Sequence, residues 1–243
     1  MILRRFAQAL KEQNWTSIAI EFVLLVLGVF LGIQVANWND ALIERRDAHD
    51  VMQRLEEDLR LTIKLTQSNA EFMTANARDT DLVLDRLRAC ELPEADRDRF
   101  ANGLYTLGKI MPARWVRTTF DELRDSGRLR LIGNAELRRA LSETARRQDS
   151  HEGIFQTRLG RLDPHIVYAD SQVIFDVAAS TGGSGDITWR QLDIDFDVAC
   201  KDRRFQTAVA AIRNYTYDGL FDSNRMQQRY TELLAMIEKE NAR

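Results

Sequence analysis

The sequence predicts an all-α fold in which one N-terminal transmembrane helix continues into an extracytoplasmic antiparallel helical bundle. Three observations predict it. Residues 18–36 are almost entirely apolar, no Gly or Pro occurs in residues 33–92, and apolar residues then recur at helical spacing over long stretches. We expect a short cytoplasmic tail at 1–17, the transmembrane helix at 18–38 and the extracytoplasmic helical domain at 39–243.

The first helix is predicted from the apolar run Ile18–Ala36, which is interrupted only by Glu21 and Gln34. At 1.5 Å per residue this run spans roughly 28 Å, close to the hydrocarbon thickness of a bilayer. Trp15 and Trp38 bracket it as interfacial anchors. A buried core helix of a soluble protein is the alternative, but an apolar circumference with paired tryptophans favours the membrane.

The orientation follows from the basic residues on either side of the run. Arg4, Arg5 and Lys11 precede it, and Arg45 and Arg46 follow it. A basic segment ahead of an apolar stretch also fits a cleaved signal peptide, but small residues do not occupy the positions that cleavage requires. We therefore expect a retained anchor with the N-terminus in the cytoplasm.

One face of the transmembrane helix is expected to contact another helix. At 100° per residue, Glu21, Gly28 and Gly32 share a narrow face. Two glycines four residues apart allow close helix approach, and an intramembrane carboxyl seldom faces lipid. Alternatively, Glu21 reaches the headgroup region and is solvated. The expected partners are the lipid bilayer and either a membrane or envelope protein or a second copy of the chain.

The composition excludes other classes of protein. Hydrophobic residues make up 44% of the 243 residues and charged residues 29%, which is the profile of a folded chain rather than a disordered or collagen-like one. Lys and Arg number 34 against 37 Asp and Glu, a formal net charge of -3. We expect no nucleic-acid partner, because such proteins normally show a basic excess or a basic face.

Apolar spacing of three and four predicts the helices of the exported domain. Pro93 and Pro164 favour helix starts at those positions. The glycine-rich segment 180–186 predicts a loop, and it lacks the Lys that a phosphate-binding loop would carry. The expected helices are a continuation of the first to about 89, then 93–109, 135–158, 163–179 and 203–240.

Local capping signals lie in the middle of the chain. Thr119 and Glu122 have the spacing of a capping box, in which each side chain accepts a hydrogen bond from a backbone N–H. Gly127 suits the left-handed residue just past that short helix. Asn134 is expected to cap the helix that begins at Ala135.

The two cysteines, Cys90 and Cys200, are expected at the same distal end of an antiparallel bundle. An exported compartment oxidises such pairs. A disulfide between them and two separately buried thiols remain the two alternatives.

No residue pattern commits the chain to a metal, cofactor or reaction. Asp193, Asp195 and Asp197 alternate with apolar residues, which predicts an extended segment, and the Gly and Glu that a calcium loop requires are missing. The histidines His49, His151 and His165 have no second ligand at zinc-site spacing and are expected at the surface or in caps. We therefore expect no catalytic, metal or cofactor-binding residues.

Two segments carry a family resemblance. The first is Glu21–Gly28 (EFVLLVLG) with Gln34–Asp40 (QVANWND), and the second is Thr119–Leu123 (TFDEL) followed by Ser126, Gly127, Leu129, Leu131, Ile132 and Asn134. Together they resemble an uncharacterised family of bacterial single-span membrane proteins, a domain of unknown function. The resemblance implies a bacterial inner-membrane protein with a helical periplasmic domain, and it implies no activity or catalytic residues.

The lead hypothesis from the sequence is a non-enzymatic, membrane-anchored interaction or scaffolding module of the bacterial envelope. The alternative is an extracytoplasmic sensor or accessory subunit of a membrane complex, which would need a separate signalling partner. A third hypothesis is an enzyme with an unrecognised site.

Overall fold

A computed structural model describes residues 15–176 and 187–242, with side chains from residue 20 onward. About 82% of the structure is helical and almost none is strand, so the all-α prediction is confirmed. The chain divides into two compact units, residues 1–51 and 52–243. Helix α2 (Trp15–Ala89) begins in the first unit and ends in the second.

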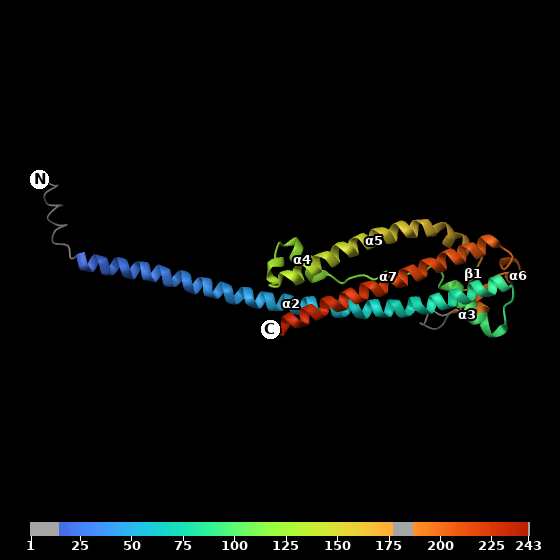
Figure 1. The fold of residues 1–243 in the computed structure, drawn as a ribbon, viewed down its shortest axis with the longest axis horizontal. Helices are drawn as coiled ribbons and strands as arrows, with labels where there is room; N and C mark the ends of the chain where they lie inside the picture. The colour runs from blue at the N-terminus through green and yellow to red at the C-terminus, as the bar shows by residue number, and fades with distance from the viewer. Residues whose placement is uncertain (1–14, 177–186, 243) are drawn as a thin grey trace. The chain divides into compact units, whose positions relative to one another are not determined.

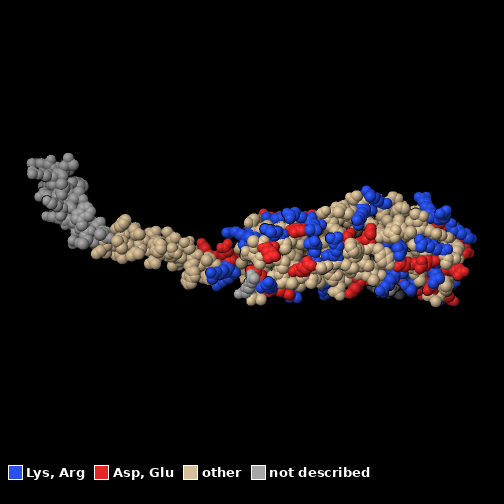
Figure 2. All heavy atoms as spheres, viewed as in Figure 1, with Lys and Arg blue, Asp and Glu red and all other residues tan. Residues whose placement is uncertain are grey.

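The described part of the first unit starts with the apolar beginning of α2, up to Trp38, and continues into a charged stretch that ends at Val51. An 18-residue window in the apolar part has a mean hydropathy of 2.1, and none of it is buried. Phe22 and Leu25 are each 66% exposed. Figure 2 shows almost no charged surface along the apolar part. Among the described residues, α2 is the one helix that is long and apolar enough to cross a membrane.

The second unit contains the rest of α2 together with α5 (Ala135–Asp170) and α7 (Arg203–Asn241). Ion pairs join Arg60 to Glu238 and Arg213 to Asp81, so α7 runs opposite to α2. Figure 1 shows these helices side by side. The hydrogen bond from Asn134 to Glu240, near the start of one helix and the end of the other, shows that α5 also runs opposite to α7.

Shorter elements connect the long helices. Strands β1 and β2 form an antiparallel pair in which Ile174 lies opposite Asp193 and Phe175 opposite Leu192. The short elements are η1 (Glu94–Asp96), α3 (Arg97–Tyr105), α4 (Thr118–Asp125), η2 (Leu129–Leu131), β1 (Ile174–Phe175), η4 (Trp189–Gln191), β2 (Leu192–Asp193) and α6 (Phe196–Ala199).

The core of the second unit is mainly apolar and includes several buried polar residues. Phe100 is fully buried, and its ring meets Phe196 edge-on at 5.6 Å between centroids. In the same unit, the Asn76 side chain donates to the carbonyl of Thr106 at 2.9 Å and accepts from the Thr106 hydroxyl at 3.0 Å. These bonds satisfy buried polar groups and fix α2 against the end of α3.

Two predicted helix boundaries are wrong. The segments 135–158 and 163–179 are not separate helices, because α5 continues through Pro164 to Asp170. Proline removes one backbone hydrogen bond, but Leu162 and Ala169 on either side of it are buried in the core and hold the helix together. The helix expected at 93–109 is a 3-10 turn followed by α3, which ends at Tyr105.

The prediction of an extended segment around Asp193–Asp197 is mostly wrong. Only Leu192 and Asp193 form a strand, after which the Asp195 side chain accepts from the N–H of Val198 at 3.1 Å and caps α6. The three carboxylates therefore do not share one face of a strand. The loop predicted at 180–186 lies outside the described residues.

The prediction of a capping box at Thr119 and Glu122 is also wrong. Helix α4 begins at Thr118, and the N–H of Thr119 donates to the Asp58 side chain at 2.9 Å. Glu122 pairs with Arg54 at 2.7 Å. In a capping box, the Glu122 side chain would accept from the N–H of Thr119. Here Asp58 of α2 accepts from that N–H instead, and Arg54 of α2 pairs with the Glu122 side chain. The other two caps are as expected: Gly127 has a φ of 70°, and Asn134 accepts from the N–H groups of Glu136 and Leu137.

Candidate functional site: an arginine-lined groove between α5 and α7

The residues predicted to contact another helix lie on the exposed part of α2. Glu21, Gly28 and Gly32 are all exposed, and a Cβ placed at either glycine would meet nothing within 4 Å. Trp38 is 68% exposed, and the side chain of Trp15 lies outside the described residues. Helix association and interfacial anchoring at these positions stay predictions.

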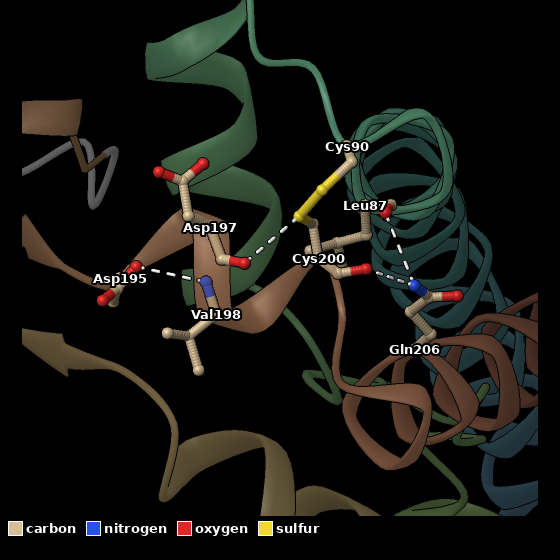
Figure 3. The surroundings of a disulfide bond; sticks show 7 residues. All are labelled: Leu87, Cys90, Asp195, Asp197, Val198, Cys200 and Gln206. Atoms are coloured by element: carbon tan, nitrogen blue, oxygen red, sulfur yellow. Dashed lines mark hydrogen bonds between the residues drawn. A yellow bond between two sulfur atoms is a disulfide. The ribbon is translucent and has the colours of Figure 1, made fainter.

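Cys90 and Cys200 are joined in a disulfide, with 5.1 Å between their Cα atoms (Figure 3). Cys90 follows the end of α2 with a φ of 54°, and Cys200 follows α6. Gln206 of α7 donates to the carbonyl of Cys200 at 2.6 Å and to that of Leu87 at 3.5 Å. The covalent link therefore joins the end of α2 to the beginning of α7.

The remaining sequence candidates do not assemble into a metal centre. Within residues 15–176 and 187–242, no group of three or more His, Cys, Asp or Glu side chains is placed to hold a metal ion. His49 is exposed and His165 is half-buried. His151 is also half-buried, and its Nε2 lies 3.3 Å from a carboxylate oxygen of Asp222.

His151 belongs to a groove of about 270 Å³ between α5 and α7. Side chains from one face of each helix line it, because residues three, four or seven apart share a helix face. Four arginines and one aspartate give the lining a net charge of +3, whereas the whole chain carries -3. The lining residues are Arg147, Ser150, His151, Ile154 and Arg158 of α5, and Asp222, Arg225, Met226 and Arg229 of α7.

The acidic groups at the groove are already engaged. Asp222 lies 3.5 Å from Nη1 of Arg158 and also contacts His151. Glu143 pairs with Arg147 at 2.5 Å, and the hydrogen bond from Arg147, aided by the nearby charge of Arg229, holds the pKa of Glu143 below its usual value. These pairs leave a surplus of positive charge on the α7 wall.

That surplus consists of Arg225 and Arg229. Neither forms an ion pair or a side-chain hydrogen bond with any residue that the structure describes. Arg225 is exposed and Arg229 half-buried. Because an arginine presents a planar fork of N–H donors, two unpaired guanidinium groups facing one groove are suited to a ligand with several acceptor oxygens.

Ile154 and Met226 are the apolar residues of the groove lining, and a smaller cavity of about 20 Å³, enough for one water molecule, shares part of that lining. Met226 is buried, and Ile154 remains 48% exposed at the groove. The smaller cavity shares His151 and Ile154 with the groove and is also lined by Ser223, whose buried hydroxyl has no hydrogen-bond partner in the described part of the chain.

A second hollow, of about 330 Å³, lies near the start of α7 and includes His165, Tyr168 and Arg204. Two of its polar residues, Tyr168 and Arg204, already have partners. The Arg204 guanidinium stacks over the Tyr168 ring at 3.9 Å, and the Tyr168 hydroxyl donates to Asp202. The groove with unpaired arginines is therefore the stronger candidate.

Reasoning from the sequence missed the groove. It identified His151 but expected it at the surface or in a helix cap, and it gave the arginines no role. The spacing of Arg225 and Arg229, four residues apart on a helix, predicts that they share a face. It does not predict a groove, because that also depends on which face of α5 lies opposite. No family model, curated protein or solved structure was found to match this chain.

Proposed function

We propose that this protein is an interaction or scaffolding module anchored in the bacterial inner membrane by a single span at residues 18–38. Residues 39–243 form its periplasmic domain, an antiparallel helical bundle that binds a partner. The observation that carries the proposal is the apolar beginning of α2, where the most apolar 18-residue stretch contains no buried residue. A continuous apolar surface of this kind is stable among lipid tails and unfavourable in water.

The disulfide supports the periplasmic placement of the domain. Disulfides persist in oxidising compartments and are rare in the cytosol. Cys90 and Cys200 lie in the second unit, so that unit would be exported while Arg4, Arg5 and Lys11 retain the N-terminal tail in the cytoplasm.

The family resemblance gains a structural interpretation from the contacts of its second motif. Glu122 of that motif pairs with Arg54 of α2, and Asn134 caps α5 while donating to Glu240 of α7 at 3.0 Å. The motif residues thus hold α4 and α5 against the other long helices. Membership of the single-span family stays a proposal, and it concerns fold rather than activity.

The nature of the groove supports binding as the role of the domain. It offers guanidinium donors, apolar side chains and a partly buried histidine with its carboxylate partner. A sensor or accessory subunit is the second candidate, favoured by the fact that α2 is one helix from Trp15 to Ala89. An uninterrupted helix offers a route by which a signal could pass along the chain.

Fusions to the full-length chain test the topology. A C-terminal alkaline phosphatase should be active and a C-terminal green fluorescent protein dark, with the protein retained in the membrane fraction. The reverse pattern, or the uncleaved protein in the aqueous fraction, would contradict the anchor.

Purification in mild detergent with crosslinking mass spectrometry tests the scaffolding role. We expect a second copy or an envelope protein to be crosslinked, and Gly28→Leu with Gly32→Leu to reduce that yield. Gly153→Leu, at an exposed position of α5 with open space around it, serves as the control. A monomer that crosslinks to nothing would contradict the proposal.

A further inference from the structure

The α7 wall of the groove carries two like charges close together. Arg225 and Arg229 lie four residues apart on α7, a spacing at which like charges repel. Glu232, three residues after Arg229 on α7, accepts a hydrogen bond from Gln228 at 3.1 Å. Asp222 and Glu143 are occupied by Arg158 and Arg147. An anion in the groove would relieve this repulsion.

The groove has room for more than a single oxyanion. Its volume of about 270 Å³ is close to the lower end for small-molecule sites, about 300 Å³. Ile154 and Met226 supply apolar surface, and the adjoining cavity carries the unpartnered, buried hydroxyl of Ser223. A ligand with an anionic end and a less polar body fits this lining.

Phosphate is the anion that matches the arginine arrangement best. A carboxylate is satisfied by one bidentate guanidinium, whereas a phosphate group presents more oxygens and up to two charges. The groove offers two guanidinium groups that have no ion-pair partner in the described part of the chain, Arg225 and Arg229, and a third, Arg147, that is shared with Glu143.

We infer that the groove between α5 and α7 is a binding site for a small ligand that carries a phosphate group. Its phosphate is held by Arg225 and Arg229, and its body lies on Ile154 and Met226. The ligand is either a soluble phosphate ester or the headgroup of a phospholipid. The inference goes beyond the proposed membrane anchoring and does not depend on it.

Calorimetric titration of the full-length protein in a neutral maltoside detergent tests the inference. The probes are inorganic phosphate and dihexanoyl phosphatidylglycerol, with malonate for comparison. The test variant is Arg225→Gln with Arg229→Gln. The matched control is Arg139→Gln with Arg161→Gln, two exposed α5 arginines outside the groove.

We expect at least one phosphate-bearing probe to bind the wild type and the control equally at fixed ionic strength. The test variant should bind it at least about tenfold more weakly, since each lost charged hydrogen bond contributes this much. Binding of inorganic phosphate assigns the site to soluble phosphates. Binding of the phospholipid alone assigns it to a lipid headgroup.

Three results would overturn the inference: no binding of either phosphate-bearing probe, equal weakening in both variants, or equal affinity for malonate. Circular dichroism and a non-reducing gel establish that each variant is folded and oxidised. The membrane fusions are a separate measurement, so failure of the ligand inference is distinguishable from failure of the anchor.

Discussion

The hydroxyl of Tyr230 donates a hydrogen bond of 2.6 Å to the side-chain oxygen of Gln148, with both residues buried between α7 and α5. The amide of Gln148 in turn donates to the carbonyl of Ala113 at 3.0 Å. Burial raises the pKa of Tyr230 well above its usual value. One polar chain therefore ties three separate segments of the domain together.

Tyr230→Phe should destabilise the domain by about 1–3 kcal/mol, because it leaves the buried oxygen of Gln148 without a donor. Urea denaturation followed by tryptophan fluorescence measures the change. Tyr105→Phe is the control, since the Tyr105 hydroxyl has no hydrogen bond within the described residues. Equal stability of the two variants would show that the buried bond contributes nothing.

Gly103→Ala should destabilise the domain by about 1–3 kcal/mol, the usual range for overpacking. The added Cβ would lie 2.8 Å from both the Asp79 carbonyl oxygen and a Val83 methyl group. Gly160→Ala in α5 meets open space and should instead stabilise by about 0.5–1 kcal/mol. Chemical denaturation of both variants checks the opposite signs, and a stable Gly103→Ala would mean that α2 and α3 separate at little cost.

Removal of the disulfide should cost about 2–5 kcal/mol, because the bond joins residues 110 apart and restricts the unfolded chain. Cys90→Ser with Cys200→Ser should melt at a lower temperature than the oxidised wild type, and reductant should lower the melting temperature of the wild type alone. Thiol alkylation provides the direct check: two reactive thiols in the unreduced protein would contradict the bond.

Acid should weaken the start of α7. The hydrogen bond from Tyr168 lowers the pKa of Asp202 despite slight desolvation. A lowered pKa in the folded state means that Asp202 contributes stability above its unfolded pKa of about 3.9 and loses it as the pH falls through the folded value. Asp202→Asn, which keeps a capping oxygen, should therefore show a shallower loss of stability below about pH 4.

Denaturation curves between about pH 2 and pH 7 measure this difference. Asp163→Asn, at an exposed carboxylate of α5 with no ion pair among the described residues, is the control and should follow the wild type. Parallel curves for wild type and Asp202→Asn would show that Tyr168 and Asp202 are not coupled in solution.

The features that the sequence predicted correctly depend on short-range rules. The apolar spacing along α2 and α7 marked both helices almost to their ends. Gly127 and Asn134 were assigned correctly because a left-handed residue and an N-cap make their contacts within a few residues.

The predictions that failed depended on contacts far along the chain. Thr119 obtains its partner from Asp58, 61 residues away, and α5 passes Pro164 because buried neighbours hold it. The groove was not predicted from the sequence for the same reason. Each of Arg147, Arg225 and Arg229 resembles a solvated surface residue until the facing helix is known.

The bond between Cys90 and Cys200 makes the backbone from one to the other a closed ring. A single protease cut anywhere on that ring leaves one covalent molecule, with α7 still tethered to the N-terminal helix through sulfur. The fragments part only when reductant is added. Damage to a connecting segment therefore need not release the C-terminal helix from the N-terminal one.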